Sequence, residues 1–273
     1  MNTHPFLSAM RAEFLKLKRT LALWLIVIMP SVATLIVVLQ FVRLYELPPE
    51  ETIWYQAPPQ VEVWRYLISE ITSFWALLLL PLFIPLQAAL INGVEHGANT
   101  WKQLFALPAA RWTILGSKYF MLLLTVIAVF MVMVIEIILC GLLLIARIAD
   151  FQSVVLMDAF PLDFLMMTFF SQIAASLFLI AIHGWLSIRL RSFTAAIGAG
   201  IAGTVLSYFF NQNPIGQYFP YSIPGLVTSY VTDSGIRYYA QPEVVPSVIV
   251  YSLIFGVVLT IIGIFSLARR DIL

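Results

Sequence analysis

Charged residues are scarce in this chain of 273 residues, in which Asp, Glu, Lys and Arg together make up 11%. A typical soluble domain contains about 25% of such residues. Hydrophobic residues make up 61%, so the composition excludes an ordinary soluble domain and predicts an integral membrane protein. The chain has one cysteine, Cys140, which excludes a disulfide within the chain.

The chain also lacks the motifs of nucleotide-binding and hydrolytic proteins. It contains no G-x-x-x-x-G-K-S/T phosphate loop, no G-x-G-x-x-G after a predicted strand, no H-E-x-x-H and no G-x-S-x-G. We therefore expect a chain that hydrolyses no nucleotide itself, has no catalytic residue and binds no metal, cofactor or nucleic acid.

Apolar runs of about 20 residues, the length that crosses a hydrocarbon core of about 30 Å, occur six times. They predict membrane-spanning helices at Leu21–Val42, Tyr66–Ile91, Tyr119–Ile145, Asp163–Ile188, Phe193–Phe210 and Val244–Leu267. Pro81 and Pro85 should kink the second helix. The expected fold is an all-α polytopic membrane protein, with residues 1–273 forming a single transmembrane domain.

Basic residues are distributed unevenly between the two sides of these spans. Eleven of the 15 lysines and arginines lie on one side: Arg11, Lys16, Lys18 and Arg19 before the first span, Lys102, Arg111 and Lys118 in the second connection, Arg189 and Arg191 in the fourth, and Arg269 and Arg270 after the sixth. The positive-inside rule then places both termini in the cytoplasm. An even number of spans agrees with this topology.

A short polar stretch between the second and third spans predicts a helix outside the membrane. Asn99 is a candidate N-cap, Trp101, Leu104 and Phe105 fall on one helical face, and Pro108 ends the turn. A helix this short is marginal in water by itself. We therefore expect either the bilayer surface or a docked protein to hold it.

Residues 1–20 have the pattern of an interfacial helix. An apolar stripe is formed by Phe6, Met10, Phe14, Leu17 and Leu21. Cations for anionic headgroups are supplied by Arg11, Lys16, Lys18 and Arg19. Glu13 projects close to the stripe and does not fit the pattern. The alternative is a plain basic flank to the first span.

Residues 211–243, between the fifth and sixth spans, contain proline and glycine yet remain apolar and aromatic. This composition favours an extracellular segment that re-enters the outer leaflet, packs into the end of the bundle and helps gate release of the cargo. The candidate gate residues are Tyr218, Pro220, Tyr221, Pro224 and Leu226. The alternative is an aromatic loop at the membrane interface.

Two polar residues inside predicted spans are candidate functional residues. Glu136 is surrounded by aliphatic residues, and we expect it to be protonated and bonded to a neighbouring backbone carbonyl, or else to belong to a substrate path or proton relay. His183 is expected to be a buried histidine satisfied by hydrogen bonds. Two other function classes use these residues: a membrane enzyme with Glu136 and His183 as an acid/base pair acting on a lipid, and an ion-coupled secondary transporter using Glu136.

Taken together, these features resemble the permeases of ABC-2-type exporters, the membrane-spanning half of an ABC transporter whose ATPase is a separate chain. The most specific stretch runs from Glu95 through Thr100-Trp101-Lys102-Gln103-Leu104, Leu107-Pro108 and Arg111-Trp112 to Lys118. Within that family, the segments Phe14–Arg19 and Tyr218–Pro224 are similar to those of lantibiotic-immunity and bacitracin-resistance permeases.

The resemblance implies that residues 92–112 form a coupling loop whose short helix binds the ATPase. Its implied coupling residues are Glu95, Thr100, Trp101, Lys102, Leu104, Phe105, Pro108 and Arg111. It further implies two ATPase copies, which bind ATP and Mg²⁺, and a second permease, identical or a sister chain. The expected activity is export of an amphipathic peptide, antibiotic or lipid-like substrate across the cytoplasmic membrane of a prokaryote.

Overall fold

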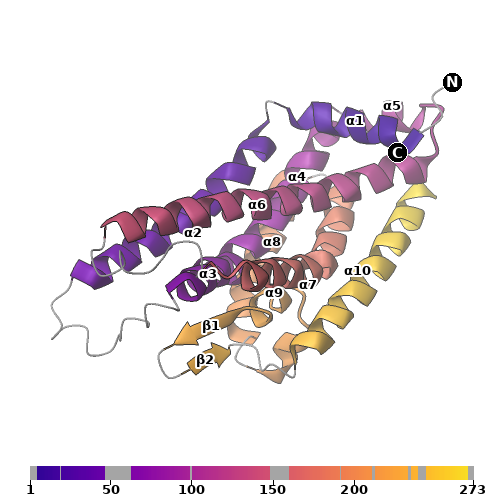
Figure 1. Cartoon of the computed structure of the whole chain (residues 1–273). Helices are drawn as coiled ribbons and strands as arrows, with labels where there is room; N and C mark the ends of the chain where they lie inside the picture. The colour runs from indigo at the N-terminus through magenta and orange to yellow at the C-terminus, as the bar shows by residue number, and fades with distance from the viewer. Residues whose placement is uncertain are drawn as a thin grey trace.

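The computed structural model describes residues 5–18, 20–46, 63–98, 100–147, 160–190, 192–210, 213–232, 235–238 and 244–269. The helices are α1 (Pro5–Leu17), α2 (Leu21–Glu46), α3 (Val63–Phe74), α4 (Leu80–Ala98), α5 (Trp101–Phe105), α6 (Arg111–Arg147), α7 (Leu162–Arg189), α8 (Phe193–Phe210), α9 (Ile223–Leu226) and α10 (Val245–Ala268) (Figure 1). A π-helical turn, η2 (Trp75–Leu79), joins α3 to α4, and a 3₁₀ helix, η4 (Pro214–Tyr218), precedes α9.

Six helical stretches are long and apolar enough to cross a membrane, which confirms the predicted spans. They are Leu21–Arg43, Leu67–Ala98, Arg111–Leu144, Leu162–Arg189, Phe193–Phe210 and Val245–Ala268. The third begins earlier than predicted: α6 has 37 residues, a length of about 55 Å at 1.5 Å per residue. Because this exceeds the hydrocarbon thickness, α6 extends beyond the apolar layer.

A short β-hairpin is the one departure from an all-helical fold within the described residues. Strands β1 (Ser229–Thr232) and β2 (Gly235–Tyr238) pair antiparallel, with Ser229 opposite Tyr238. The hairpin lies within residues 211–243, for which no strand was predicted. It satisfies the backbone groups of a stretch that proline and glycine keep from continuing as a helix.

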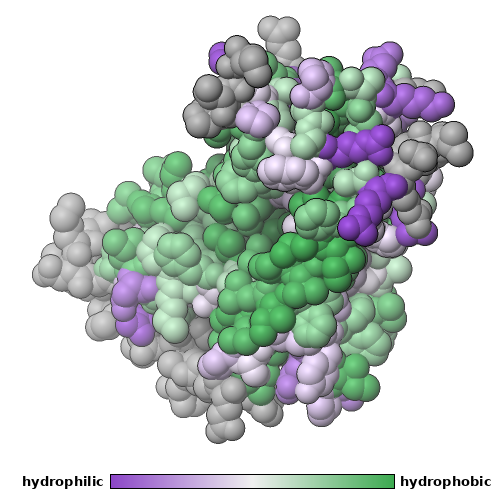
Figure 2. Space-filling model, turned by 90° about the vertical axis from the view of Figure 1, so that its right-hand side faces the viewer, coloured by the Kyte–Doolittle hydropathy of each residue, from purple (hydrophilic) through white to green (hydrophobic). Residues whose placement is uncertain are grey.

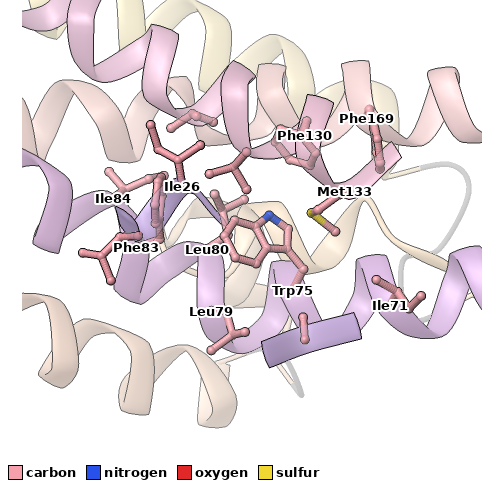
Figure 3. Close-up of a cluster of buried hydrophobic side chains, with 14 of the residues drawn as sticks. Ile26, Ile71, Trp75, Leu79, Leu80, Phe83, Ile84, Phe130, Met133 and Phe169 are labelled. Carbon is pink, nitrogen blue, oxygen red and sulfur yellow. The ribbon is translucent and has the colours of Figure 1, made fainter. Parts of the chain in front are cut away.

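The second span departs from regular α-helix close to the predicted kink, in the π-helical turn η2. The Leu80 N–H bonds to Trp75 O, five residues back, directly before Pro81, which has no N–H to donate. The Trp75 side chain lies in the centre of the core, with ring centroids 5.7 Å from Phe83 and 6.4 Å from Phe130 (Figure 3). The π-helical turn therefore carries a large aromatic ring that lies where α4 and α6 meet.

Glycines allow two pairs of helices to pack closely. In α8, a Cβ built on Gly200 would lie 2.6 Å from Pro85 of α4, so only glycine allows the two helices to meet there. In α10, a Cβ on Gly256 would lie 2.8 Å from the Leu177 backbone of α7. Helix α7 lies between α4 and α10, and α6 packs against α1 and α2.

The two ends of the bundle differ in composition. Helices α1 and α5 lie near the last turn of α10 at one end, which we call the α5 end, and the β-hairpin lies away from it (Figure 1). Hydrophobic side chains cover a broad middle area of the face in Figure 2, and strongly hydrophilic side chains gather above it. Such a belt is the surface that a bilayer requires.

Candidate functional site

Helix α5 begins at Trp101 and ends at Phe105, between α4 and α6, as the polar stretch predicted. The N-cap is Thr100, one residue after the predicted Asn99, and its side chain makes no capping hydrogen bond. Asn99 itself lies outside the described residues. A short turn through Leu107 and Pro108 then leads to the start of α6 at Arg111.

Trp101 does not form an exposed knob; its side chain is buried at 6% exposure. It packs in a cluster at the α5 end with Leu115 and Tyr119 of α6, Ile188 of α7 and Leu267 of α10. Its indole Nε1 donates to His96 Nδ1 at 3.2 Å. The apolar face of α5 therefore serves to hold α5 on the bundle, and Leu104 and Phe105 pack against the same cluster.

The outward surface of this connection includes two predicted coupling residues, Lys102 and Pro108, together with Leu107 and Trp112, which the sequence named only as part of the family-like stretch. Leu107 is 53% exposed and Trp112 is 54% exposed. Lys102, Gln103 and Pro108 are exposed beside them in the sequence. The signal in the sequence was that Leu107 and Trp112 are apolar but do not belong to the apolar face formed by Trp101, Leu104 and Phe105.

Arg111 connects the same loop to the end of α10. Its Nη1 donates to Ala268 O at 3.1 Å, and its guanidinium lies 5.4 Å from the centre of the Phe105 ring. A cation is favourable at a helix C-terminus, where carbonyl groups lack partners. Arg111 therefore joins α5, α6 and α10.

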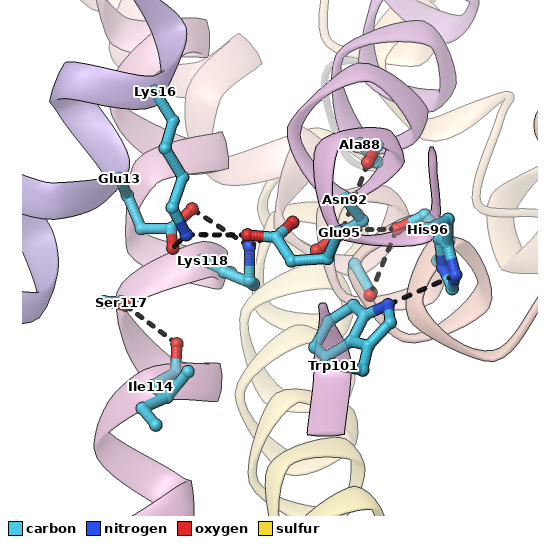
Figure 4. A network of polar contacts seen from close by, with 12 residues as sticks. Glu13, Lys16, Ala88, Asn92, Glu95, His96, Trp101, Ile114, Ser117 and Lys118 are labelled. Atoms are coloured by element: carbon cyan, nitrogen blue, oxygen red, sulfur yellow. Dashed lines mark hydrogen bonds and ion pairs between the residues drawn. The ribbon is translucent and has the colours of Figure 1, made fainter. Parts of the chain in front are cut away.

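A closed ring of four alternating charges lies beside α5 (Figure 4). Lys16 Nζ is 2.7 Å from Glu13 Oε1 and 2.6 Å from Glu95 Oε1. Lys118 Nζ is 2.9 Å from Glu13 Oε2 and 2.9 Å from Glu95 Oε2. The ring joins α1, α4 and α6, and its charges sum to zero.

Burial makes this ring important for stability. The Lys118 side chain is 1% exposed, and those of Glu13 and Glu95 are also buried. Removing one partner of a buried ion pair leaves an uncompensated charge, which destabilises a protein by about 3–5 kcal/mol. Lys118 Nζ also lies 5.4 Å from the centre of the Trp101 ring, so the ring of charges touches α5 directly.

Lys16 is the ring member nearest to solvent. Partial burial by itself would lower the pKa of its ammonium group, but the hydrogen bonds and negative charges of Glu13 and Glu95 outweigh burial and raise this pKa above its usual value. Lys16 was predicted to bind headgroups. It is instead engaged within the protein by two carboxylates.

Helix α1 faces the bundle with part of its predicted lipid-binding stripe. Leu17 is buried, Met10 is half-buried against the core, and Phe6 contacts Phe120 of α6 edge to face. The exposed side chains of α1 include Leu7, Arg11, Phe14 and Leu15, and Lys18, directly after α1, is exposed as well. Arg19 lies outside the described residues. Glu13 did not fit a lipid-facing stripe because its partner is Lys118.

Glu136 bonds to two hydroxyl groups of α2 and not, as predicted, to a backbone carbonyl. Its Oε1 lies 2.5 Å from Ser31 Oγ, and its Oε2 accepts from Thr34 Oγ1 at 3.1 Å. Ser31 Oγ also lies 2.8 Å from Val27 O. Because a serine hydroxyl has one hydrogen, both Ser31 contacts are satisfied together when Glu136 carries a proton and donates it to Ser31.

His183 is buried in α7 and bonds through Nε2 to the hydroxyl of Tyr221, which also donates to Ala199 O of α8 at 3.2 Å. This agrees with the predicted buried histidine. Its neighbour Gly184 touches the Tyr119 ring of α6, and Glu136 lies about 25 Å farther along that helix at 1.5 Å per residue. The two residues therefore cannot act together as an acid/base pair.

The segment between α8 and α10 is buried at its centre. Residues 221–228 are all buried, with Ile223, Leu226 and Val227 packed against Ala175 of α7 and Val248 of α10. Pro224 is buried with them, and Pro220 is partly buried. Tyr218 differs from the other predicted gate residues, because it is 65% exposed.

Among the described residues, no group of three or more His, Cys, Asp or Glu side chains could hold a metal ion.

Comparison with known proteins identifies the family. Residues 9–207 match the family model described as ABC-2 family transporter protein. A search of curated proteins and a search of solved structures each found no match. The matched region contains most of α1, the α5 connection, the first four spans and most of the fifth. Because it covers well over half of the chain, the protein belongs to the ABC-2 family of transporter proteins.

Proposed function

We propose that this protein is the permease of an ATP-driven exporter and that a separate ATPase chain docks on its α5 connection. The observation that supports this most directly is the construction of that connection. Trp101 anchors α5 among α6, α7 and α10, while Leu107 and Trp112 are exposed next to it. An exposed leucine on this loop and an exposed tryptophan in the first turn of α6 are suited to fill pockets of a partner.

The contacts around α5 provide a route for movement from the ATPase to the spans. Displacement of α5 would act on α10 through Arg111 and Ala268, and on α4 through the bond between Trp101 and His96. The ring of Glu13, Lys16, Glu95 and Lys118 would carry the same displacement to α1. The bundle would therefore move as several coupled helices.

The assembly that we propose contains two permeases and two ATPases, with ATP and Mg²⁺ bound by the ATPases. The second permease is either a second copy of this chain or a sister chain. In this arrangement both termini and α5 face the cytoplasm, and the protein lies in the cytoplasmic membrane of a prokaryote. The basic residues at the α5 end support this orientation by the positive-inside rule.

We propose an amphipathic peptide, an antibiotic or a lipid-like molecule as the cargo. The apolar interior favours such a molecule over a small ion. We assign gating on the outer side to the buried segment 221–228, because it lies between α7 and α10 and would have to shift if these helices separated. Glu136 is engaged with Ser31 and Thr34, which gives no support to an ion-coupled transporter.

Co-purification tests the docking surface. A tagged permease is purified from its native membrane, the chains bound to it are identified, and the recovered ATPase is measured. We expect Trp112→Ala and Leu107→Ala to reduce recovery, with a loss of about 2 kcal/mol for a hot-spot tryptophan. The matched control is Trp24→Ala, because Trp24 is also exposed but lies on α2 within a span. Full recovery with both α5-connection variants would refute the docking surface.

A further inference from the structure

A groove of about 500 Å³ opens on the protein surface between α4 and α8 at the α5 end. Its apolar walls include Ala89, Gly93 and Gly97 of α4 and Phe193 and Ala196 of α8. The volume is within the range of sites that bind small molecules, which is about 300–1,000 Å³. The groove meets the α5 connection at His96, whose Nδ1 accepts from Trp101.

Two glycines leave the floor of the groove open. Gly93 and Gly97 are four residues apart in α4 and therefore lie on the same helix face. A Cβ built on either residue would have no atom within 4 Å. The glycines at helix contacts differ, because a Cβ on Gly200 or Gly203 would collide with Pro85 or Tyr221. The space above Gly93 and Gly97 is thus not filled by the protein.

One end of the groove is polar. It is lined there by Thr20, His96, Ser187 and Ser192. Thr20 directly precedes α2, His96 and Ser187 lie in the last turns of α4 and α7, and Ser192 directly precedes α8. The groove therefore runs from the apolar part of the helices to their ends, the level at which headgroups meet hydrocarbon.

Charge near the polar end is positive. Lys18 is exposed and lies two residues before the lining residue Thr20. Arg189 is exposed and lies one residue before the lining residue Leu190. The carboxylate adjoining the lining residues in the sequence, Glu95, is already paired with Lys16 and Lys118. A negatively charged group is therefore favoured at this end.

We propose that the groove binds one anionic phospholipid, with an acyl chain along Gly93 and Gly97 and the phosphate near Thr20 and Ser192. Water is a poor occupant of the apolar part, because a bound water needs 2–4 polar partners. The groove also opens between two predicted spans whose rim residues, Val94 and Phe193, are exposed, so lipid is the molecule that surrounds it. This site depends neither on an ATPase nor on the exported cargo.

Native mass spectrometry tests the site with a matched pair of variants. The protein is reconstituted into vesicles of equal phosphatidylglycerol and phosphatidylcholine and released in mild detergent, and bound lipid is counted. The wild type should retain one phosphatidylglycerol per chain. Gly93→Phe fills the open floor and should lose it, whereas Gly198→Phe should retain it, because Gly198 also has no atom within 4 Å of a built Cβ but does not line the groove.

Two outcomes of this measurement would overturn the proposal. One is retention by Gly93→Phe equal to that of Gly198→Phe, and the other is equal retention of both lipids by the wild type. If Gly93→Phe does not fold, the unaltered protein is labelled with a phosphatidylglycerol that carries a photoreactive acyl chain. Crosslinks should then concentrate on residues 89–97 and 193–196, and an even spread over the outer faces of α2 and α10 would refute the site.

Discussion

The hydroxyl of Tyr221, in the segment between α8 and α10, bonds to Nε2 of His183 inside the bundle. His183 lies about 9 Å along α7 from the end of that helix at Arg189, at 1.5 Å per residue. The segment was expected only at the opposite end of the spans. The segment that carries Tyr221 therefore reaches deep between the spans, and the Tyr221 ring fills the space above Gly203 of α8.

Tyr221→Phe should therefore destabilise the folded protein. It removes the hydroxyl and leaves the buried His183 Nε2 without its partner, an effect of about 1–3 kcal/mol. Thermal unfolding in detergent measures the change. Tyr218→Phe is the control, because Tyr218 is 65% exposed and its loss of a hydroxyl should leave the unfolding temperature unchanged. Equal unfolding temperatures for Tyr221→Phe and the wild type would contradict the role of this bond.

Lys118→Met should destabilise the protein by about 3–5 kcal/mol, because it leaves Glu13 and Glu95 with only Lys16 between them. Adding Glu13→Gln removes the excess negative charge and leaves the balanced pair Lys16–Glu95. The double variant should accordingly unfold at a higher temperature than Lys118→Met. Additive destabilisation by the two changes would argue against a coupled ring.

Trp101→Ala and Trp112→Ala should have different effects. Trp101 is buried, so its truncation should reduce stability by about 3–5 kcal/mol, as read from thermal unfolding of the permease alone. Trp112 is exposed, so its truncation should leave stability unchanged and reduce ATPase recovery. If Trp101→Ala is stable but fails to recover the ATPase, Trp101 contacts the ATPase directly and belongs to the docking surface.

Glu136→Gln should leave both folding and export nearly unchanged, since an amide can still donate to Ser31 and accept from Thr34. Glu136→Leu removes both interactions and should lower the yield of folded protein. Size-exclusion chromatography and a transport assay on the two variants measure these effects. Loss of export by well-folded Glu136→Gln, with the ATPase still bound, would place the carboxyl group in the transport mechanism.

Cysteine accessibility tests the outer gate in a Cys140→Ala background. Val227→Cys should be protected from a membrane-impermeant thiol reagent, because Val227 is buried, whereas Ile215→Cys should react, because Ile215 is exposed. If residues 221–228 gate export, labelling of Val227→Cys should change when the assembled transporter binds ATP. Unchanging protection would leave the segment as a fixed part of the bundle and refute the gate.

The sequence determined the features that depend on neighbouring residues in the chain. Apolar runs of sufficient length specify the six spans, Pro81 follows an irregular π-helical turn in the second, and the polar break after α4 yields α5. Local chemistry is sufficient in these cases, because span length and helix interruption depend on hydrophobicity and on missing N–H donors. The segment between the fifth and sixth spans was predicted to pack into the bundle, and its residues 221–228 are buried, although Tyr218 of the predicted gate set is exposed.

Tertiary structure alone decided which side chains meet. Glu13 and Lys118 are 105 residues apart, as are Ser31 and Glu136, so their pairing depends on how α1, α2 and α6 pack. The burial of Trp101 was decided in the same way. The apolar face of α5 could bind a partner or pack on the protein itself, and residues of α6, α7 and α10 bury it. The spacing along one helix gives the face on which a residue lies, but the neighbour of that face is set by helices far away in the chain.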